Sequence, residues 1–251
     1  MESNLHYSAN HLESPNRPPV ILIHGAGGFH LSWPPHIRRM ENYPVYALDL
    51  NGHGESMNGV RTTIEEHSRD VLRLIRSLGL KQAILAGHSM GGAVALTIAV
   101  EQPRLLSGLI LISTGAKLRV ASTLLEAASR KETFPQAVES VIQNSFSQNA
   151  DSRIRELTRQ RMLLTNPSTL HADLLACQAF NALDALPHVS VPTLILCGSE
   201  DVMTPPRLSR ALYEKIAGSQ FELVPNAGHM LMLERPAALK GFLEEFLNTL
   251  E

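Results

Sequence analysis

The stretch Ala83–Gly92, AILAGHSMGG, decides the fold because it places one serine between glycines directly after an apolar run. Gly87-His88-Ser89-Met90-Gly91 matches the pattern G-x-S-x-G, and the small, apolar segment Gly92–Val100 follows it. A strand, a sharp turn and a helix in that order hold a serine in a strained, accessible position. The residues two positions before and after Ser89 must then lack side chains. The stretch therefore predicts a turn that presents Ser89 as a nucleophile. A glycine-rich nucleotide-binding turn is the alternative, but the chain has neither G-x-G-x-x-G nor a Walker lysine.

Further apolar runs have the length and composition of buried strands: Val20–Ile23, Val45–Leu48, Leu109–Ile112, Thr193–Leu196 and Phe221–Val224. Nearly all are continuously apolar, which is typical of strands covered on both faces in a parallel sheet. Helical patterns separate them. One opens at the apparent capping box Thr62-Thr63-Ile64-Glu65 and stops at Gly79, and Pro236–Leu250 forms the last. The sequence predicts an α/β fold with a doubly wound, mostly parallel sheet of about seven to eight strands, flanked by helices.

Residues 117–187 interrupt this alternation with several helical patterns and no convincing strand. A connection of about seventy residues is far longer than an ordinary loop. We expect a helical cap inserted before the penultimate strand, with residues 1–116 and 188–251 forming the core. Within the cap, four arginines cluster, and a solvated helix face is the simpler interpretation, with an anion-binding patch as the alternative: Arg153, Arg155, Arg159 and Arg161.

Composition excludes several classes of protein. The chain has 251 residues, 44% of them hydrophobic, which is enough for one sizeable core. Its formal net charge of −2 gives no electrostatic case for nucleic acid or an anionic membrane. The N-terminus lacks a signal-peptide pattern and the apolar runs are too short to span a bilayer, so we expect a cytoplasmic protein. The two cysteines, Cys177 and Cys197, lie in apolar stretches and are expected to be reduced and packed. No pattern of metal ligands stands out.

A serine nucleophile needs a general base, and the base usually needs an orienting carboxylate. Among eleven histidines, His229 is the best placed, because it follows the last predicted strand. His88 adjoins Ser89, but its side chain should point elsewhere around the turn. The remaining candidates lie in other loops and are weaker: His24, His30 and His53.

The carboxylate could follow either of two strands. After Leu109–Ile112 comes STGAKL, which contains no acid, whereas Thr193–Leu196 is followed by CGSEDVMTP, with Glu200 and Asp201. A second requirement is an oxyanion hole. The glycine-rich segment HGAGG, His24–Gly28, ends the first strong strand, and one amide from it together with that of Met90 would supply two donors.

These motifs together resemble the α/β-hydrolase superfamily, in its serine esterase and lipase-like branch with a helical cap. The similarity runs from roughly Pro19 to Pro236 through VILIHGAGG, ALDLNGHGES, AILAGHSMGG, TLILCGSEDVMTP and PNAGHMLMLERP. It implies Ser89 as the nucleophile, His229 as the general base and acid, and Asp201 as the orienting acid.

The same resemblance bears on the neighbouring residues. Glu200 is less favoured as the acid, because the family's acid usually lies three residues beyond the glycine, here Gly198. Ala26 is implied as the first oxyanion donor, with Gly27 as the fallback, and Met90 as the second.

The chain departs from the family in two places. The family usually begins with two antiparallel strands, whereas here only LHYSA looks extended, so we expect a truncated hairpin. Asn51 stands where many members have proline, and only a local effect on the turn is expected.

The implied reaction is hydrolysis of carboxylic esters with small to medium, apolar acyl groups through an acyl-enzyme, with no cofactor or metal. Phe29, Met203 and Met230 adjoin the candidate catalytic residues and are expected to line an apolar pocket. We expect a small-molecule ester or lactone as the partner, neither nucleic acid nor membrane, and a monomer or homodimer. Two alternatives stay open: a lactonase or C–C bond hydrolase of this fold, and a ligand receptor or signalling protein with slow turnover. A serine at the turn argues against haloalkane dehalogenase and epoxide hydrolase chemistry, which use a carboxylate there.

Overall fold

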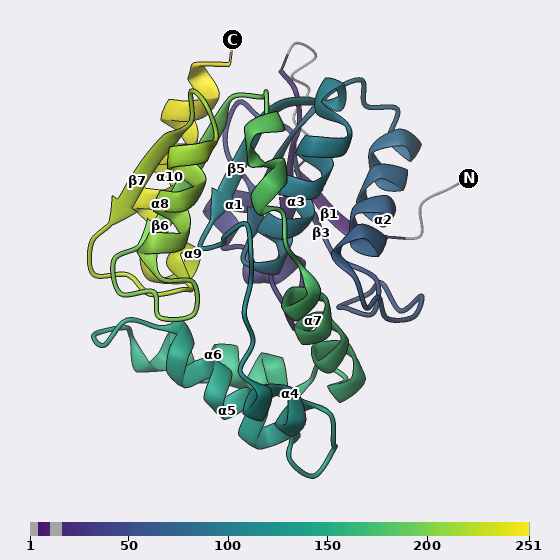
Figure 1. Ribbon diagram of the computed structural model, residues 1–251, viewed down its shortest axis with the longest axis vertical. Coiled ribbons are helices and arrows are strands. Elements are labelled where there is room, and N and C mark those ends of the chain that lie inside the picture. Colours follow the sequence, from purple (N-terminus) through teal and green to yellow (C-terminus); the bar gives the residue numbers. More distant parts are fainter. Residues whose placement is uncertain (1–4, 11–16, 251) are drawn as a thin grey trace.

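A seven-stranded sheet forms the centre of the protein in a computed structural model, which describes residues 5–10 and 17–250 (Figure 1). The strand order is β1-β3-β2-β4-β5-β6-β7, and every pairing is parallel except that of β1 with β3. The strands are β1 (Tyr7–Asn10), β2 (Val20–Ile23), β3 (Val45–Leu48), β4 (Ala83–His88), β5 (Leu106–Ile112), β6 (Thr193–Gly198) and β7 (Gln220–Val224). The predicted α/β fold class is confirmed.

Helices cover both faces of the sheet, which explains why its central strands are apolar at successive positions. Alternate strand residues belong to separate hydrophobic clusters, as Leu85 and Ile84 on β4 do. One cluster packs against α2 (Ile64–Ser77), α3 (Met90–Glu101) and α8 (Pro206–Lys215). The other packs against α1 (Pro35–Arg38), α9 (Leu231–Glu234) and α10 (Pro236–Asn248). Burial on both faces is what a continuously apolar parallel strand requires.

The start of α2 differs by one residue from the predicted capping box. The N-cap residue is Thr63, whose hydroxyl accepts a hydrogen bond from the Glu66 amide at 3.2 Å. The Glu66 carboxylate in turn accepts one from the Thr62 amide at 2.9 Å. Glu66, three residues after the cap, therefore takes the place that the sequence assigns to Glu65, but its carboxylate reaches the amide before the N-cap, so the reciprocal box predicted with Glu65 is not formed. The helix stops as expected beside Gly79, which has a φ of 66°.

Residues 117–187, called the helical insertion below, lie between β5 and β6 and contain no strand, and the structure describes all of them. The helices of the insertion are α4 (Ser122–Ala128), α5 (Phe134–Ser145), α6 (Ser152–Leu163) and α7 (Pro167–Ala179), followed by a 3-10 helix over Leu183–His188. Figure 1 shows α4, α5 and α6 gathered apart from the sheet, with α7 running between them and the core. They enclose a hydrophobic cluster of their own, which includes Phe134 and Leu170.

Two further expectations concern the whole chain. Both cysteines are buried and free, and burial raises the pKa of the Cys197 thiol to about 12. Both thiols are therefore reduced and packed, as the sequence predicts. Within the described residues, no helix combines the length and hydropathy needed to cross a membrane.

Candidate active site

Ser89 occupies the sharp turn between β4 and α3, with a φ of 52° and a ψ of −117°. The turn leaves no room for side chains beside it. A Cβ atom on Gly87 would overlap the carbonyl oxygen of Gly91, and one on Gly91 would overlap that of Ile23. Only glycine fits at both positions, as the pattern predicts. Met90 begins α3, so its amide lies outside the hydrogen bonding of the helix and at the positive end of the helix dipole.

His229 and Asp201 meet at the carboxyl ends of the last two strands. Asp201 follows β6 and His229 follows β7, and their side chains are joined by a hydrogen bond of 2.9 Å from Nδ1 to Oδ2. Both residues are buried. Because Nδ1 is held by a carboxylate, Nε2 is left as the basic nitrogen of the ring.

Asp201 is fixed by three further donors. Its Oδ1 atom accepts from the amides of Met203 at 3.0 Å and Thr204 at 2.8 Å, and its Oδ2 atom accepts from the Thr204 hydroxyl at 2.8 Å. Burial alone would raise the pKa of this carboxyl, but His229 and Thr204 outweigh burial and hold the pKa below its usual range. Sequence reasoning missed Thr204, although a threonine three residues after an aspartate is a known local hydrogen-bonding pattern.

Glu200, the alternative acid, points elsewhere. Its carboxylate accepts a hydrogen bond of 3.0 Å from the amide of Gln148 in the helical insertion. The structure therefore brings Asp201, and not Glu200, to His229.

The other histidines near the turn have separate partners. His88 lies 2.9 Å from the carbonyl oxygen of His229 through Nε2, and burial lowers the pKa of His88 to about 3. A neutral ring that donates to this carbonyl positions the His229 loop. His24 accepts the amide of Leu50 at 3.0 Å through Nε2, and burial lowers its pKa to about 3. Both side chains are uncharged at neutral pH.

The glycine-rich loop after β2 is held by a carboxylate from the helical insertion. The amide of Gly27 donates to Asp173 Oδ2 on α7 at 2.8 Å, and His53 Nε2 lies 2.7 Å from the same oxygen. Asp173 is buried, and burial would raise its pKa, but His53 and the Gly27 amide hold it below the usual range. Since the Gly27 amide is already engaged, Ala26 is the better candidate for a free donor in this loop.

The contact between Asp173 and Gly27 is not predictable from local sequence. The two residues are 146 positions apart, so no local pattern links them. One signal was available: Asp173 is an acid within the largely apolar stretch of α7, and a buried acid requires a partner.

A cavity of about 340 Å³ contains Ser89 and His229 among its lining residues. Its wall is mostly apolar and is shared between the core and the helical insertion. The predicted pocket residues Phe29, Met203 and Met230 all line it, and the insertion adds Val141, Ile154, Leu157, Met162, Leu170 and Leu174. A volume of this size suits a small molecule.

One member of the arginine cluster also reaches the cavity. Among the described lining residues, Arg161 is the one with a permanent charge, and its guanidinium lies 5.4 Å from the centre of the Phe29 ring. Arg159 instead pairs with Glu156 at 2.8 Å on the exposed face of α6. Arg161 is exposed as well, so the solvated-face interpretation describes both side chains, and Arg161 in addition borders the cavity.

The helical insertion also contacts the loop that carries His229. The Met230 amide donates to the carbonyl oxygen of Ser145 at 2.9 Å. Glu234 accepts from the amide of Gly228 at 2.9 Å and from that of Ser147 at 3.0 Å, so one carboxylate ties the two segments together. The insertion is thus attached both to the His229 loop and to the glycine-rich loop.

Comparisons with known proteins agree with this fold. The model of the alpha/beta hydrolase family matches residues 20–240. The 3-oxoadipate enol-lactonase 1 of Acinetobacter baylyi is 26% identical over 244 residues, which are 94% of this chain and 91% of that protein. The solved enol-lactonase from Burkholderia xenovorans has a TM-score of 0.91 and 25% identity, covering 97% of this chain and 96% of the other. A thermophilic esterase from Thermogutta terrifontis has a TM-score of 0.87 and 29% identity, covering 98% and 93%.

Proposed function

Since the chain belongs to the alpha/beta hydrolase family, we propose that it is a serine hydrolase that cleaves carboxylic esters with small to medium, apolar acyl groups. One observation carries this proposal. Ser89, at the strained turn, lines the same apolar cavity as His229, and the Nδ1 atom of His229 is hydrogen-bonded to the Asp201 carboxylate. A nucleophile, a base and an orienting acid are the parts that acyl transfer requires.

The proposed reaction proceeds through an acyl-enzyme. Ser89 Oγ attacks the ester carbonyl carbon while His229 Nε2 takes the hydroxyl proton, and Asp201 stabilises the imidazolium that forms. The amides of Ala26 and Met90 donate to the negative oxygen of the tetrahedral intermediate. The C–O bond to the alcohol then breaks as His229 returns the proton to the leaving oxygen. Water attacks the acyl-enzyme by the same route and releases the acid.

The helical insertion acts in this proposal as a cap that limits substrate size. It supplies apolar side chains to the cavity wall and hydrogen bonds to both loops beside Ser89. A cavity of about 340 Å³ favours short acyl chains over long ones. The protein would act on a small molecule in the cytoplasm, as a monomer or homodimer and without a cofactor.

Hydrolysis of lactones is a second candidate, because a lactone is a cyclic ester and opens through the same acyl-enzyme. Two of the similar proteins are named as enol-lactonases. Arg161, on the cavity wall, would also favour a substrate that carries a negative charge away from the reacting carbonyl.

A panel of p-nitrophenyl esters from acetate to palmitate, extended with simple lactones, tests the proposed substrate class. We expect kcat/KM to peak at a short or medium chain and to be at least about tenfold lower for palmitate, because the longer chain exceeds the cavity. A maximum at palmitate would contradict the size class. Absence of turnover on the whole panel, with Ser89 still labelled by a fluorophosphonate, would favour a receptor with slow turnover.

Replacing Asp173 by asparagine is expected to lower kcat by roughly ten- to hundredfold, with little change in KM. Asparagine keeps the shape but removes the negative charge that the Gly27 amide and His53 share at one oxygen, so both hydrogen bonds weaken and the loop with the proposed oxyanion donor is held less firmly. The measurement is steady-state kinetics on p-nitrophenyl acetate, with circular dichroism to verify the fold. Asp184→Asn, on an exposed acid of the same insertion, is the matched control. A change in KM alone would show that Asp173 acts on binding and not on the oxyanion loop.

A further inference from the structure

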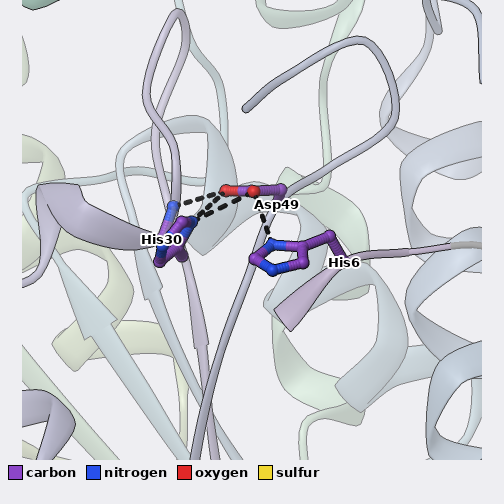
Figure 2. Close-up of side chains that lie close together, drawn as sticks. All are labelled: His6, His30 and Asp49. Atoms are coloured by element: carbon purple, nitrogen blue, oxygen red, sulfur yellow. Dashed lines mark hydrogen bonds and ion pairs between the residues drawn. The ribbon is translucent and has the colours of Figure 1, made fainter. Parts of the chain in front are cut away.

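Three side chains that the proposed hydrolysis does not use meet beside β1. His6 immediately precedes β1, His30 lies in the 3-10 helix His30–Ser32 after β2, and Asp49 directly follows β3. Figure 2 shows both rings turned toward the Asp49 carboxylate, and one ligand atom from each residue lies within 4.8 Å of the other two. We propose that His6, His30 and Asp49 form a binding site for a divalent transition-metal ion, with Zn²⁺ as the ion it suits best.

The spacing of the three side chains is close to that of a zinc site. Asp49 Oδ2 lies 2.9 Å from His6 Nδ1 and 3.0 Å from His30 Nδ1. Ligand atoms about 2.0 Å from a tetrahedral zinc ion are roughly 3.3 Å from one another. An ion between these atoms therefore replaces two N–H···O hydrogen bonds and moves each pair apart by only a few tenths of an ångström.

The carboxylate is held in place for this role. Asp49 is fully buried, and it accepts the amides of His30 at 2.6 Å and Glu55 at 3.0 Å, one on each oxygen. The site thus contains an oriented oxygen ligand, and hydrogen bonds of this kind commonly support metal-binding carboxylates.

The second nitrogen of His6 also has a suitable partner. A neutral imidazole that binds a metal through Nδ1 carries its proton on Nε2, and this N–H usually donates to a carboxylate. His6 Nε2 lies 3.6 Å from Glu55 Oε2. The His6 side chain is 31% exposed, so an ion can enter from solvent and keep a water molecule as its fourth ligand.

Two imidazole nitrogens and one carboxylate oxygen favour Zn²⁺ over Mg²⁺ or Ca²⁺, which prefer all-oxygen sites.

A bound ion would tie the start of β1 to the loops after β2 and β3. His30 follows Phe29, a wall residue of the cavity, so the ion would also fix that wall. The site is invisible to sequence patterns because its ligands are spread over 43 positions. It does not depend on the proposed ester chemistry.

Calorimetric titration of chelator-treated protein with zinc sulfate tests the proposal. We expect one saturable site in the wild type and a Kd at least about tenfold weaker in His6→Gln. Glu55→Gln, which changes a 69% exposed side chain outside the ligand set, should weaken the Kd by roughly tenfold. The matched control is His36→Gln on the exposed face of α1, which should bind zinc as the wild type does. Zinc at a hundred times the Kd should raise the Tm of the wild type by roughly 5–10 °C.

Three results would overturn the proposal. The first is the absence of saturable zinc binding by the wild type. The second is a wild-type Kd in both His6→Gln and Glu55→Gln, which would assign the binding to other surface groups. The third is an equal rise in Tm with magnesium chloride, which would show that nitrogen ligands are not involved. Circular dichroism of each variant establishes that it is folded before the titration.

Discussion

Replacing Ser89 by alanine is expected to lower kcat for p-nitrophenyl esters by about 10⁶. The variant lacks the oxygen atom that is proposed to form the acyl-enzyme, while the turn, the proposed base and the proposed oxyanion donors stay in place. Alanine fits the backbone as serine does, since both carry a single Cβ at the same φ of 52°. Stopped assays at high enzyme concentration, with a purified variant free of wild-type protein, give the residual rate.

Ser113→Ala is the matched control for this substitution. Ser113 directly follows the neighbouring strand β5, is buried, and has a φ of 48°, so the same chemical change is made in a similar backbone. We expect its turnover to stay within about twofold of the wild type. A fluorophosphonate should label Ser113→Ala but not Ser89→Ala. Wild-type turnover in Ser89→Ala would refute the whole mechanism.

Replacing Asp201 by asparagine is expected to lower kcat by about 10⁴. The carboxylate accepts the Nδ1–H of His229 at 2.9 Å and opposes the charge of the imidazolium. An asparagine amide can donate to Nδ1 instead, which places the ring proton on Nε2 and removes the base from Ser89. Asparagine has the same shape as aspartate, so it can still meet the two amides and the hydroxyl that hold Asp201, and the loop should stay folded.

Glu200→Gln tests the choice between the two adjacent acids. Its side chain contacts only the Gln148 amide among the hydrogen bonds described for it, so turnover should stay within about twofold of the wild type. Kinetics of both variants on one short-chain ester provide the measurement. A large loss in Glu200→Gln together with an active Asp201→Asn would exchange the roles of the two residues.

The sequence predicts the sheet well because the relevant signals are local. A parallel strand buried on both faces is apolar at successive positions, as Val20–Ile23 is, and this pattern needs no knowledge of its neighbours. The serine turn is equally local, since the glycines that it requires lie two positions from Ser89. The ends of strands are harder to predict, because they depend on the neighbouring strand. β4 continues to His88 because His88 still pairs with Ile112 of β5, and the sequence of β4 alone does not contain that information.

Contacts between distant segments account for what the sequence did not predict. The Asp173 carboxylate meets Gly27 across 146 positions, and His6 meets Asp49 across 43. Each depends on how the helical insertion or the first strand packs on the core. The packing of α6 on the core also decides that Arg161 lines the cavity whereas Arg159 pairs with Glu156, and the sequence alone does not distinguish the two arginines.

The hydrogen bond between Asp173 and the glycine-rich loop affects how this scaffold can be engineered. Exchanging the insertion between related hydrolases is an obvious way to change substrate preference, since it supplies much of the cavity wall. In this chain the exchange would also remove the acid that orders an amide next to the proposed oxyanion donor. A chimera or a randomised library should therefore keep aspartate at position 173 and histidine at position 53 as one unit, and vary the apolar wall residues around them.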